Sequence, residues 1–554
     1  MTRPVSPIDA LANEFCQKVL NESPEFVTSL GLPGADESTF SDYSPEGLAK
    51  MADIQRSTLA AIDAQEPTDA VDRVTVAAMK ERLGLEIESF DNTEFGDINN
   101  ITTPLQGVAE IFDLMPSDTA ADWELITARL RNVPQALKGW QKTLLLRAEH
   151  GPANAKHQIN LAIDEAAQKA SDASGIASLA ERGAAAHPQL ADTLCAAATD
   201  ARAAYAELSE FLKEKIAPHG GERDAFGRER YERRIRQFVG AKLDLDETYE
   251  WGVAELTRII AEQNRVSEEL YGPGVSIPEA MERLNNDPTR MLHGKDALQT
   301  WMQGISDQAL NDLAGTHFEI PEPMKKIECM IAPSGTGAIY YTGPSDDFSR
   351  PGRMWWSVPE TSTTFTTWQE KTTVYHEGVP GHHLQIGYTT LLRDQLNMWR
   401  RNFCWVSGHG EGWALYAEGL MRELGYMNDP GDYMGVLDAE RLRASRVVLD
   451  IGVHLEKPAP AQYQHISPVW NRDVAWQFLQ DNVAMDRSFL QFELNRYLGW
   501  AGQAPSYKIG HRMWKQLRAD AELRDGANFN LKDWHTQALS LGSVGLDVLR
   551  EAMA

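Results

Sequence analysis

The chain has 554 residues, of which 42% are apolar, and a formal net charge of −27. This length exceeds the usual limit for one hydrophobic core and predicts two lobes, and the apolar content excludes a generally disordered protein. Residues 1–350 carry −24 of the charge and residues 351–554 only −3. Such an anionic surface repels phosphates, which excludes binding to nucleic acid or to a membrane surface as the main activity.

The N-terminal segment and the cysteines indicate the compartment. The first ten residues lack the apolar segment of a secretory signal, and no window approaches the roughly 18 uninterrupted apolar residues of a membrane span. Four cysteines are spread along the chain without a CxxC pair, a usage typical of a reducing environment. We therefore expect a cytoplasmic protein.

The first 320 residues have the composition of helices. Residues 161–216 are rich in Ala, Glu, Lys and Leu, which are good helix formers. A further helix is expected to begin near Asp244, which has the spacing of a capping box with Glu247. We assign residues 1–320 to an acidic helical lobe. Six arginines at 223–236 form a basic segment within this acidic lobe. We interpret them as one face of a helix that forms ion pairs; the alternative is that they attract an anionic substrate.

Prolines and glycines concentrate at residues 320–362 and separate two short runs that predict strands, Ala338–Thr342 and Met354–Val358. Helical patterns return after Thr361 and continue to the C-terminus. The sequence thus predicts a mainly α fold with a small β-sheet, in which residues 321–554 form a second, catalytic lobe. The second run is expected to be an edge strand, which can bind an extended peptide segment by β-augmentation.

Three histidines fall within eight residues, in the run His376-Glu-Gly-Val-Pro-Gly-His-His383. A helix with His-Glu and a second His one turn later presents two imidazoles to one Zn²⁺, and Glu377 then lies where it can deprotonate a metal-bound water. Here position i+4 is Pro380, and residues seven apart stand about 10 Å apart along a straight helix. Glycine and proline permit a bulge, which brings His382, or alternatively His383, to the second ligand position.

A zinc ion with two imidazoles takes a third protein ligand and keeps a position for water. Glu411 and Glu418 share one face of a downstream helical segment, and carboxylates among apolar neighbours are costly to bury without a metal or a cationic partner. We predict Glu411 as the third ligand, with His409 as a competitor. Glu418 is predicted to orient a metal ligand by a hydrogen bond. The alternative is that it lies on a solvent-exposed face of the helix.

The string HEGVPGHHLQ, followed by EGWALYAE, resembles the bacterial family of domain of unknown function 885. That family is similar to zinc metallopeptidases whose third ligand is a glutamate, such as the thermolysin, carboxypeptidase Taq and oligopeptidase groups. The match is densest over residues 335–515. The resemblance implies a two-lobed helical zinc-peptidase-like architecture with a central cleft, with Zn²⁺ held by His376, His382 and Glu411 and with Glu377 as general base.

Attack of water on an amide creates a charged oxygen that needs a donor besides the metal. The candidates are Tyr507, His454 and Lys508, and similar zinc peptidases use Tyr and His in this way. Each of the first two candidates has an equally good structural interpretation. Tyr507 can instead be a half-buried aromatic residue, and His454 can instead be a hydrogen-bonded histidine of the core. Arg350, in the turn before the second predicted strand, is a candidate for binding a substrate carboxylate through a bidentate pair, and Lys508 is a second substrate contact.

These residues predict a zinc-dependent metallopeptidase that cleaves short peptides. One alternative is a metal-dependent amidohydrolase that acts on a non-peptide amide, since it would use the same ligands. Another is a non-catalytic protein with a structural metal. Glu377 argues against the latter, because a structural site is normally closed by four protein ligands and needs no adjacent base. The expected partner is a peptide or amide substrate, with neither nucleic acid nor membrane.

Overall fold

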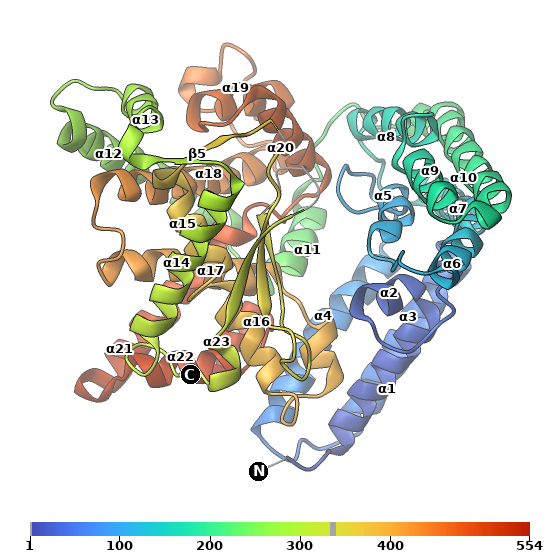
Figure 1. Ribbon diagram of the computed structural model, residues 1–554, viewed down its shortest axis with the longest axis horizontal. Helices are drawn as coiled ribbons and strands as arrows, with labels where there is room; N and C mark the ends of the chain where they lie inside the picture. Colours follow the sequence, from blue (N-terminus) through green and yellow to red (C-terminus); the bar gives the residue numbers. More distant parts are fainter. Residues whose placement is uncertain (1–2, 333–338, 360) are drawn as a thin grey trace.

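The computed structural model describes residues 3–332, 339–359 and 361–554 and shows a mainly helical protein with small sheets (Figure 1). This fold class is the one the sequence predicts. The first ten helices lie within residues 1–211 and are α1 (Pro7–Glu22), α2 (Pro24–Leu30), α3 (Pro45–Asp63), α4 (Ala70–Asp91), α5 (Pro104–Glu110), α6 (Ala120–Leu130), α7 (Val133–His150), α8 (Lys156–Ala170), α9 (Gly175–Ala186) and α10 (Ala191–Phe211).

Four helices lead from there to the sheets. They are α11 (Arg228–Val239), α12 (Leu245–Tyr271), α13 (Ile277–Asn285) and α14 (Lys295–Leu313). The side chain of Asp244 accepts hydrogen bonds from the backbone N–H groups of Asp246 and Glu247, which satisfies the free donors of the first turn of α12. The predicted helix start near Asp244 is confirmed.

Within the described residues, five short strands form two sheets. They are β1 (Met291–His293), β2 (Ile327–Ile331), β3 (Ile339–Thr342), β4 (Gly352–Trp356) and β5 (Thr364–Thr366). The larger sheet has the order β2-β4-β3, with β4 parallel to β2 and antiparallel to β3. Both predicted strands are confirmed, as β3 and β4, although Ala338 lies outside the described residues. The prediction of an edge strand at Met354–Val358 is wrong, because β2, which the sequence analysis missed, covers the other side of β4.

The remaining helices carry the histidine motif and its surroundings. They are α15 (Thr367–Glu377), α16 (His382–Leu391), α17 (Ser407–Glu423), α18 (Pro430–His454), α19 (Arg472–Asn482), α20 (Arg487–Gly499), α21 (Ser506–Asp525), α22 (Leu531–Leu539) and α23 (Leu546–Met553). Strand β5 pairs with β1 and runs directly into α15. None of the described helices is both long and apolar enough to cross a bilayer.

Buried apolar side chains form two clusters. The smaller one spans Ile98–Ile216 and holds α5–α10 together, and Figure 1 shows these helices grouped to one side of the sheets. The larger one takes in side chains from α1, α3 and α4 and from α11 to the C-terminus. The boundary between the two clusters therefore does not lie at residue 320, where the sequence predicts a boundary between lobes, because α11–α14 pack with the segments that carry the histidine motif.

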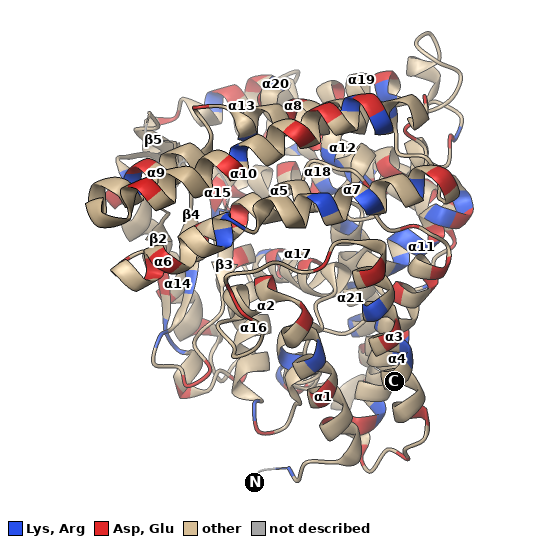
Figure 2. Ribbon diagram, turned by 90° about the vertical axis from the view of Figure 1, so that its right-hand side faces the viewer, with Lys and Arg blue, Asp and Glu red and all other residues tan. Residues whose placement is uncertain are grey.

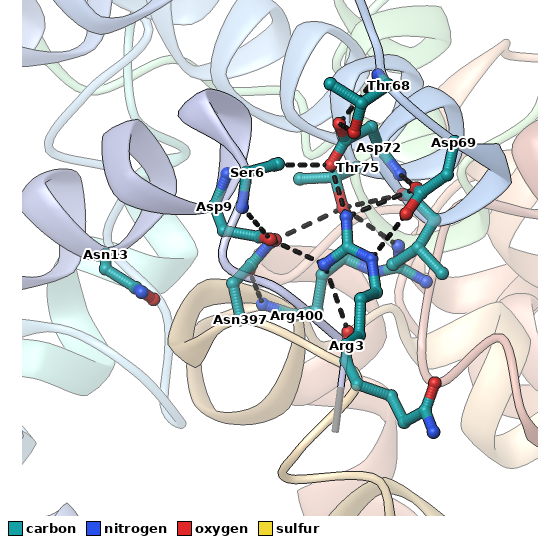
Figure 3. A network of polar contacts seen from close by, with 12 residues as sticks. Arg3, Ser6, Asp9, Asn13, Thr68, Asp69, Asp72, Thr75, Asn397 and Arg400 are labelled. Carbon is teal, nitrogen blue, oxygen red and sulfur yellow. Dashed lines mark hydrogen bonds and ion pairs between the residues drawn. The ribbon is translucent and has the colours of Figure 1, made fainter. Parts of the chain in front are cut away.

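A polar network fastens the N-terminal segment to the larger cluster (Figure 3). The Arg3 guanidinium forms ion pairs with Asp9, Asp69 and Asp72. The Asn397 side chain donates to Asp9 over 3.0 Å. Because Asn397 lies just before the segment that leads to α17, this network fixes α1 and α4 against the elements around the histidine motif.

Candidate metal centre

The histidine motif spans two helices and the turn between them. The sequence predicts a bulged helix, whereas α15 ends at Glu377 and α16 begins anew at His382. The Gly381 N–H donates to the carbonyl of Tyr375 over 3.1 Å. A Cβ atom on Gly381 would lie 1.9 Å from the carbonyl oxygen of His376, so this turn requires glycine. The break shortens the path from His376 to His382 and brings both imidazoles together.

The structure places His376, His382 and Glu411 around one point. Their ligand atoms all lie within 4.8 Å of one another. Glu411 Oε2 is 3.2 Å from His376 Nε2 and 3.6 Å from His382 Nε2. Atoms bound about 2.1 Å from a tetrahedral zinc stand about 3.4 Å apart. The 3.2 Å pair also has the length of a hydrogen bond, whereas 3.6 Å is too long for one. The spacing therefore fits three ligands of one zinc ion.

Two other histidines have structural partners. His383 Nε2 is 2.8 Å from the carbonyl oxygen of Met324, and its Nδ1 is 2.9 Å from the hydroxyl of Tyr341. His409 is buried against Trp514, and its Nδ1 accepts a hydrogen bond from a backbone N–H. The structure thus brings His382, rather than His383, to Glu411, and it leaves His409 away from the cluster.

Glu418 fixes the orientation of His376. Its Oε1 lies 2.7 Å from His376 Nδ1, and its Oε2 accepts from the hydroxyl of Thr372. Because a carboxylate only accepts, Nδ1 carries a proton, and Nε2 points toward Glu411, where it would bind a metal once it has lost its own proton. Burial lowers the pKa of His376, but hydrogen bonds with Glu411 and Glu418 outweigh it and raise that pKa to about 10. The carboxylates thus stabilise a cation at this point.

Glu377 is 8% exposed and follows His376 directly. Burial raises the pKa of its carboxyl, and the Glu411 carboxylate adds to the rise, while the imidazoles of the cluster oppose it. A carboxylate with a raised pKa is a stronger proton acceptor. Among the described residues none forms a hydrogen bond with this carboxylate, so it is free to bind a water molecule.

Tyr507 lies beside the cluster from the first turn of α21. Burial raises the pKa of its phenol to about 12, and the nearby Glu411 carboxylate contributes to this rise. The guanidinium of Arg446 lies 5.1 Å from the centre of the Tyr507 ring. A phenol that stays protonated at neutral pH is a hydrogen-bond donor, which is the role the sequence predicts for it.

The family model described as "Bacterial protein of unknown function (DUF885)" matches residues 24–553. The chain belongs to this family. Two solved structures cover 99% of it: "the putative lipoprotein from Colwellia psychrerythraea" (22% identity, TM-score 0.81, 99% of that chain) and "a putative lipoprotein of unknown function from Shewanella oneidensis" (16% identity, TM-score 0.76, 100% of that chain). These likenesses show a shared fold. No curated protein matches the chain.

In this member of the DUF885 family, His454 and Lys508 are core residues. His454 is 1% exposed, its Nε2 lies 3.0 Å from the carbonyl oxygen of Tyr497, and burial lowers its pKa to about 4. Lys508 is also 1% exposed, and its Nζ lies 3.1 Å from carboxylate oxygens of both Glu255 and Glu440. The predicted roles of His454 as a donor and of Lys508 as a substrate contact do not agree with these positions.

Arg350 stabilises its own turn. Its guanidinium donates to the carbonyl oxygens of Gly343 and Pro351 over 2.8 and 3.1 Å, so the structure does not direct it to a substrate carboxylate. The arginines of the run 223–236 are paired as well. Acidic and basic residues follow one another along α11 (Figure 2), and the partners of its arginines include Glu94 and Asp97. This agrees with the ion-pair interpretation.

Two arginines of α18 are site residues that the sequence analysis missed. The charge of Arg443 acts on both Glu377 and Tyr507, where it lowers the pKa. Arg446 stacks over Tyr507. Their signal in the sequence is the run Arg-Leu-Arg-Ala-Ser-Arg at 441–446, which places Arg443 and Arg446 on one helix face at i and i+3.

Proposed function

We propose that the protein is a zinc-dependent hydrolase, and specifically a metallopeptidase that cleaves short peptides. One observation carries this proposal. The ligand atoms of His376, His382 and Glu411 surround one point, and the neighbouring carboxylate of Glu377 forms no hydrogen bond with any described residue. Three protein ligands leave one position of a tetrahedral zinc for water, which is the arrangement of catalytic rather than structural zinc sites.

The side chains around the cluster supply the remaining steps. A zinc ion held by His376, His382 and Glu411 would supply Lewis-acid chemistry. Glu377 is placed to accept a proton from the attacking water as general base and to pass it to the leaving amine. The phenol of Tyr507 donates a hydrogen bond to the carbonyl oxygen as it gains charge. Glu418 keeps the His376 ring in the orientation that directs Nε2 to the metal.

The recessed position of the cluster favours short substrates over folded proteins. His376, Glu377 and His382 are 5%, 8% and 6% exposed. Trp405 is 49% exposed, and the centre of its ring lies 6.2 Å from the centre of the His382 ring. Trp405 also lines a pocket of about 440 Å³ between α1, α3, α4 and the segment before α17. We propose that this pocket belongs to the central cleft of a two-lobed peptidase and receives an apolar substrate side chain.

We place the protein in the cytoplasm, because none of its four cysteines is paired with another. Two solved structures of the same fold are described as putative lipoproteins, which makes the membrane surface the alternative location. Fractionation of cells that express the natural gene decides between the two locations, since an anchored protein sediments with the membranes and a cytoplasmic one does not.

The test of the hydrolase is cleavage of a mixed peptide library by the zinc-loaded protein, with products identified by mass spectrometry. We expect cleavage by the wild type and a rate lower by about 10²–10⁴-fold for Glu377→Gln, the range that general-base catalysis contributes. Glu423→Gln, an exposed change on α17, is the matched control. Cleavage of no peptide by the wild type, or an undiminished rate for Glu377→Gln, would contradict the proposal.

A further inference from the structure

Among the described residues, two aromatic side chains that are nearly half exposed line one pocket. Trp405 is 49% and Phe26 45% exposed, and both line the pocket of about 440 Å³ described above. The Phe26 ring stacks on Phe403, with ring centres 5.7 Å apart, and Phe403 lines the same pocket. Large apolar side chains that are exposed together are typical of a ligand-binding site. This pocket is therefore a candidate binding site.

Apolar side chains form most of the remaining wall. They are Phe15, Val19, Met51, Leu83, Leu85 and Trp399. Aromatic rings thus line the cavity from α1, from α2 and from the segment 399–405. Such rings attract a further ring more strongly than an aliphatic group of equal area, because stacked and edge-to-face pairs add to the effect of burial. The volume lies within the range of pockets that bind small molecules, so its size does not exclude a phenyl or an indole group.

The charged side chains of the pocket wall already have partners in the protein. Arg82 forms an ion pair with Glu81 and donates to the carbonyl oxygen of Gln237. Glu86 accepts a hydrogen bond from the side-chain amide of Gln55. A charged occupant would lose its water without meeting a free counter-charge, and that loss is costly. The lining therefore favours an uncharged side chain.

Trp405 connects the pocket with the proposed metal centre. The centre of its ring lies 6.2 Å from the centre of the His382 ring. A Cβ atom on Gly410 would lie 2.4 Å from a carbon of the Trp405 ring, so the indole packs directly on the backbone that precedes Glu411. Successive residues of an extended peptide are about 3.5 Å apart. A substrate side chain that packs on this indole therefore belongs to a residue that flanks the bond held at the cluster.

We propose that this pocket binds an aromatic side chain of the substrate, carried by a residue that flanks the cleaved bond. This inference rests on the proposed function and narrows the apolar side chain given there to that of phenylalanine, tyrosine or tryptophan. The rings of Phe26, Phe403 and Trp405 supply the stacked and edge-to-face contacts that an aromatic occupant uses and an aliphatic one does not.

Four acetylated and amidated pentapeptides test this assignment. Each consists of alanine except for a central phenylalanine, leucine, lysine or alanine, so each can bind in the register that places its central side chain in the pocket. Their dissociation constants are measured by calorimetry on the zinc-loaded Glu377→Gln protein, which holds the peptides without rapid cleavage. We expect the phenylalanine peptide to bind about 10–100-fold more tightly than the alanine peptide, with leucine between them and lysine close to alanine.

Adding Phe26→Ala removes one ring of the pocket and should lower the preference for phenylalanine over alanine about 2–10-fold. It should leave zinc content and the affinity for the alanine peptide unchanged, because α2 carries none of the proposed ligands. Trp405→Ala should lower the preference further, and Trp405→Phe should retain part of it. Phe489→Ala is the matched control, because Phe489 is 49% exposed on α20 and does not line this pocket. Glu86→Gln should leave the preference unchanged.

A phenylalanine peptide that binds no more tightly than the leucine or the alanine peptide would overturn the inference. So would tighter binding of the lysine peptide, since Glu86 rather than the rings would then select the occupant. Cleavage by the wild type at bonds that do not flank the phenylalanine would refute the position of the pocket. The proposed function fails in a different way. If the wild type cleaves none of the peptides but the preference for phenylalanine still depends on Phe26 and Trp405, the hydrolase is refuted and the aromatic pocket stands.

Discussion

Glu418 should control zinc affinity without being a ligand. Its carboxylate is 3% exposed, lies 2.7 Å from His376 Nδ1 and is held on its other oxygen by Thr372. Partners that orient a ligand contribute about 10–100-fold to metal affinity, which is about 1.4–2.7 kcal/mol. Glu418→Gln keeps an acceptor but loses the charge, so we expect zinc affinity to fall about 10-fold. Glu418→Ala removes both, and we expect a fall of about 100-fold.

The assay is competition for zinc with a chromophoric chelator at neutral pH, on proteins whose folding has been checked by circular dichroism. Thr372→Val removes only the contact to the second carboxylate oxygen and should give a smaller loss than Glu418→Ala. Glu423→Gln, at an exposed position of the same helix, should bind zinc as the wild type does. If a folded Glu418→Ala protein binds zinc with wild-type affinity, the orienting role is refuted.

Three further predictions concern the turn, a mispredicted lysine and the ion pairs. Gly381→Ala places a Cβ atom against the His376 carbonyl and should weaken zinc binding more than 100-fold in the chelator assay, whereas Gly304→Ala, with open space around it, should not. Lys508→Met leaves two glutamates without their cation and should cost about 3–5 kcal/mol in urea unfolding; a raised KM at unchanged stability would contradict its structural role. Burial raises the pKa of Asp97, but three arginines lower it to about 2. This depressed pKa stabilises the fold above about pH 4 by about 2 kcal/mol, an amount lost as the pH falls toward 2. Asp97→Asn should flatten the dependence of unfolding free energy on pH in that range, and an unchanged slope would refute the assignment.

The positions of the proposed metal ligands were predictable because their signal is local. His376, Glu377 and His382 lie within one short run, and glycines in that run indicate a departure from a straight helix. Glu411 and Glu418 share a face at i and i+7, a spacing that any helix preserves. The strands β3 and β4 were visible for the same reason, since aromatic and β-branched residues cluster there.

The errors concern contacts between distant segments. In the sequence nothing near Lys508 indicates a partner for its ammonium group. In the folded chain α12 and α18 place Glu255 and Glu440 at ion-pair distance from it. The place of β4 in the centre of its sheet depends on a parallel partner, β2, whose short run gave too weak a pattern. Arg446 belongs to no motif, and its contact with Tyr507 is formed only in the folded chain.

The proposed hydrolase activity requires one zinc ion per chain at the proposed centre. The decisive measurement is the zinc content of the purified protein after dialysis against metal-free buffer, determined by inductively coupled plasma mass spectrometry. We expect about one equivalent for the wild type and for Glu423→Gln, and less than about a tenth of an equivalent for Glu411→Ala. A folded wild type without zinc, or an equal zinc content in Glu411→Ala, would contradict the central claim.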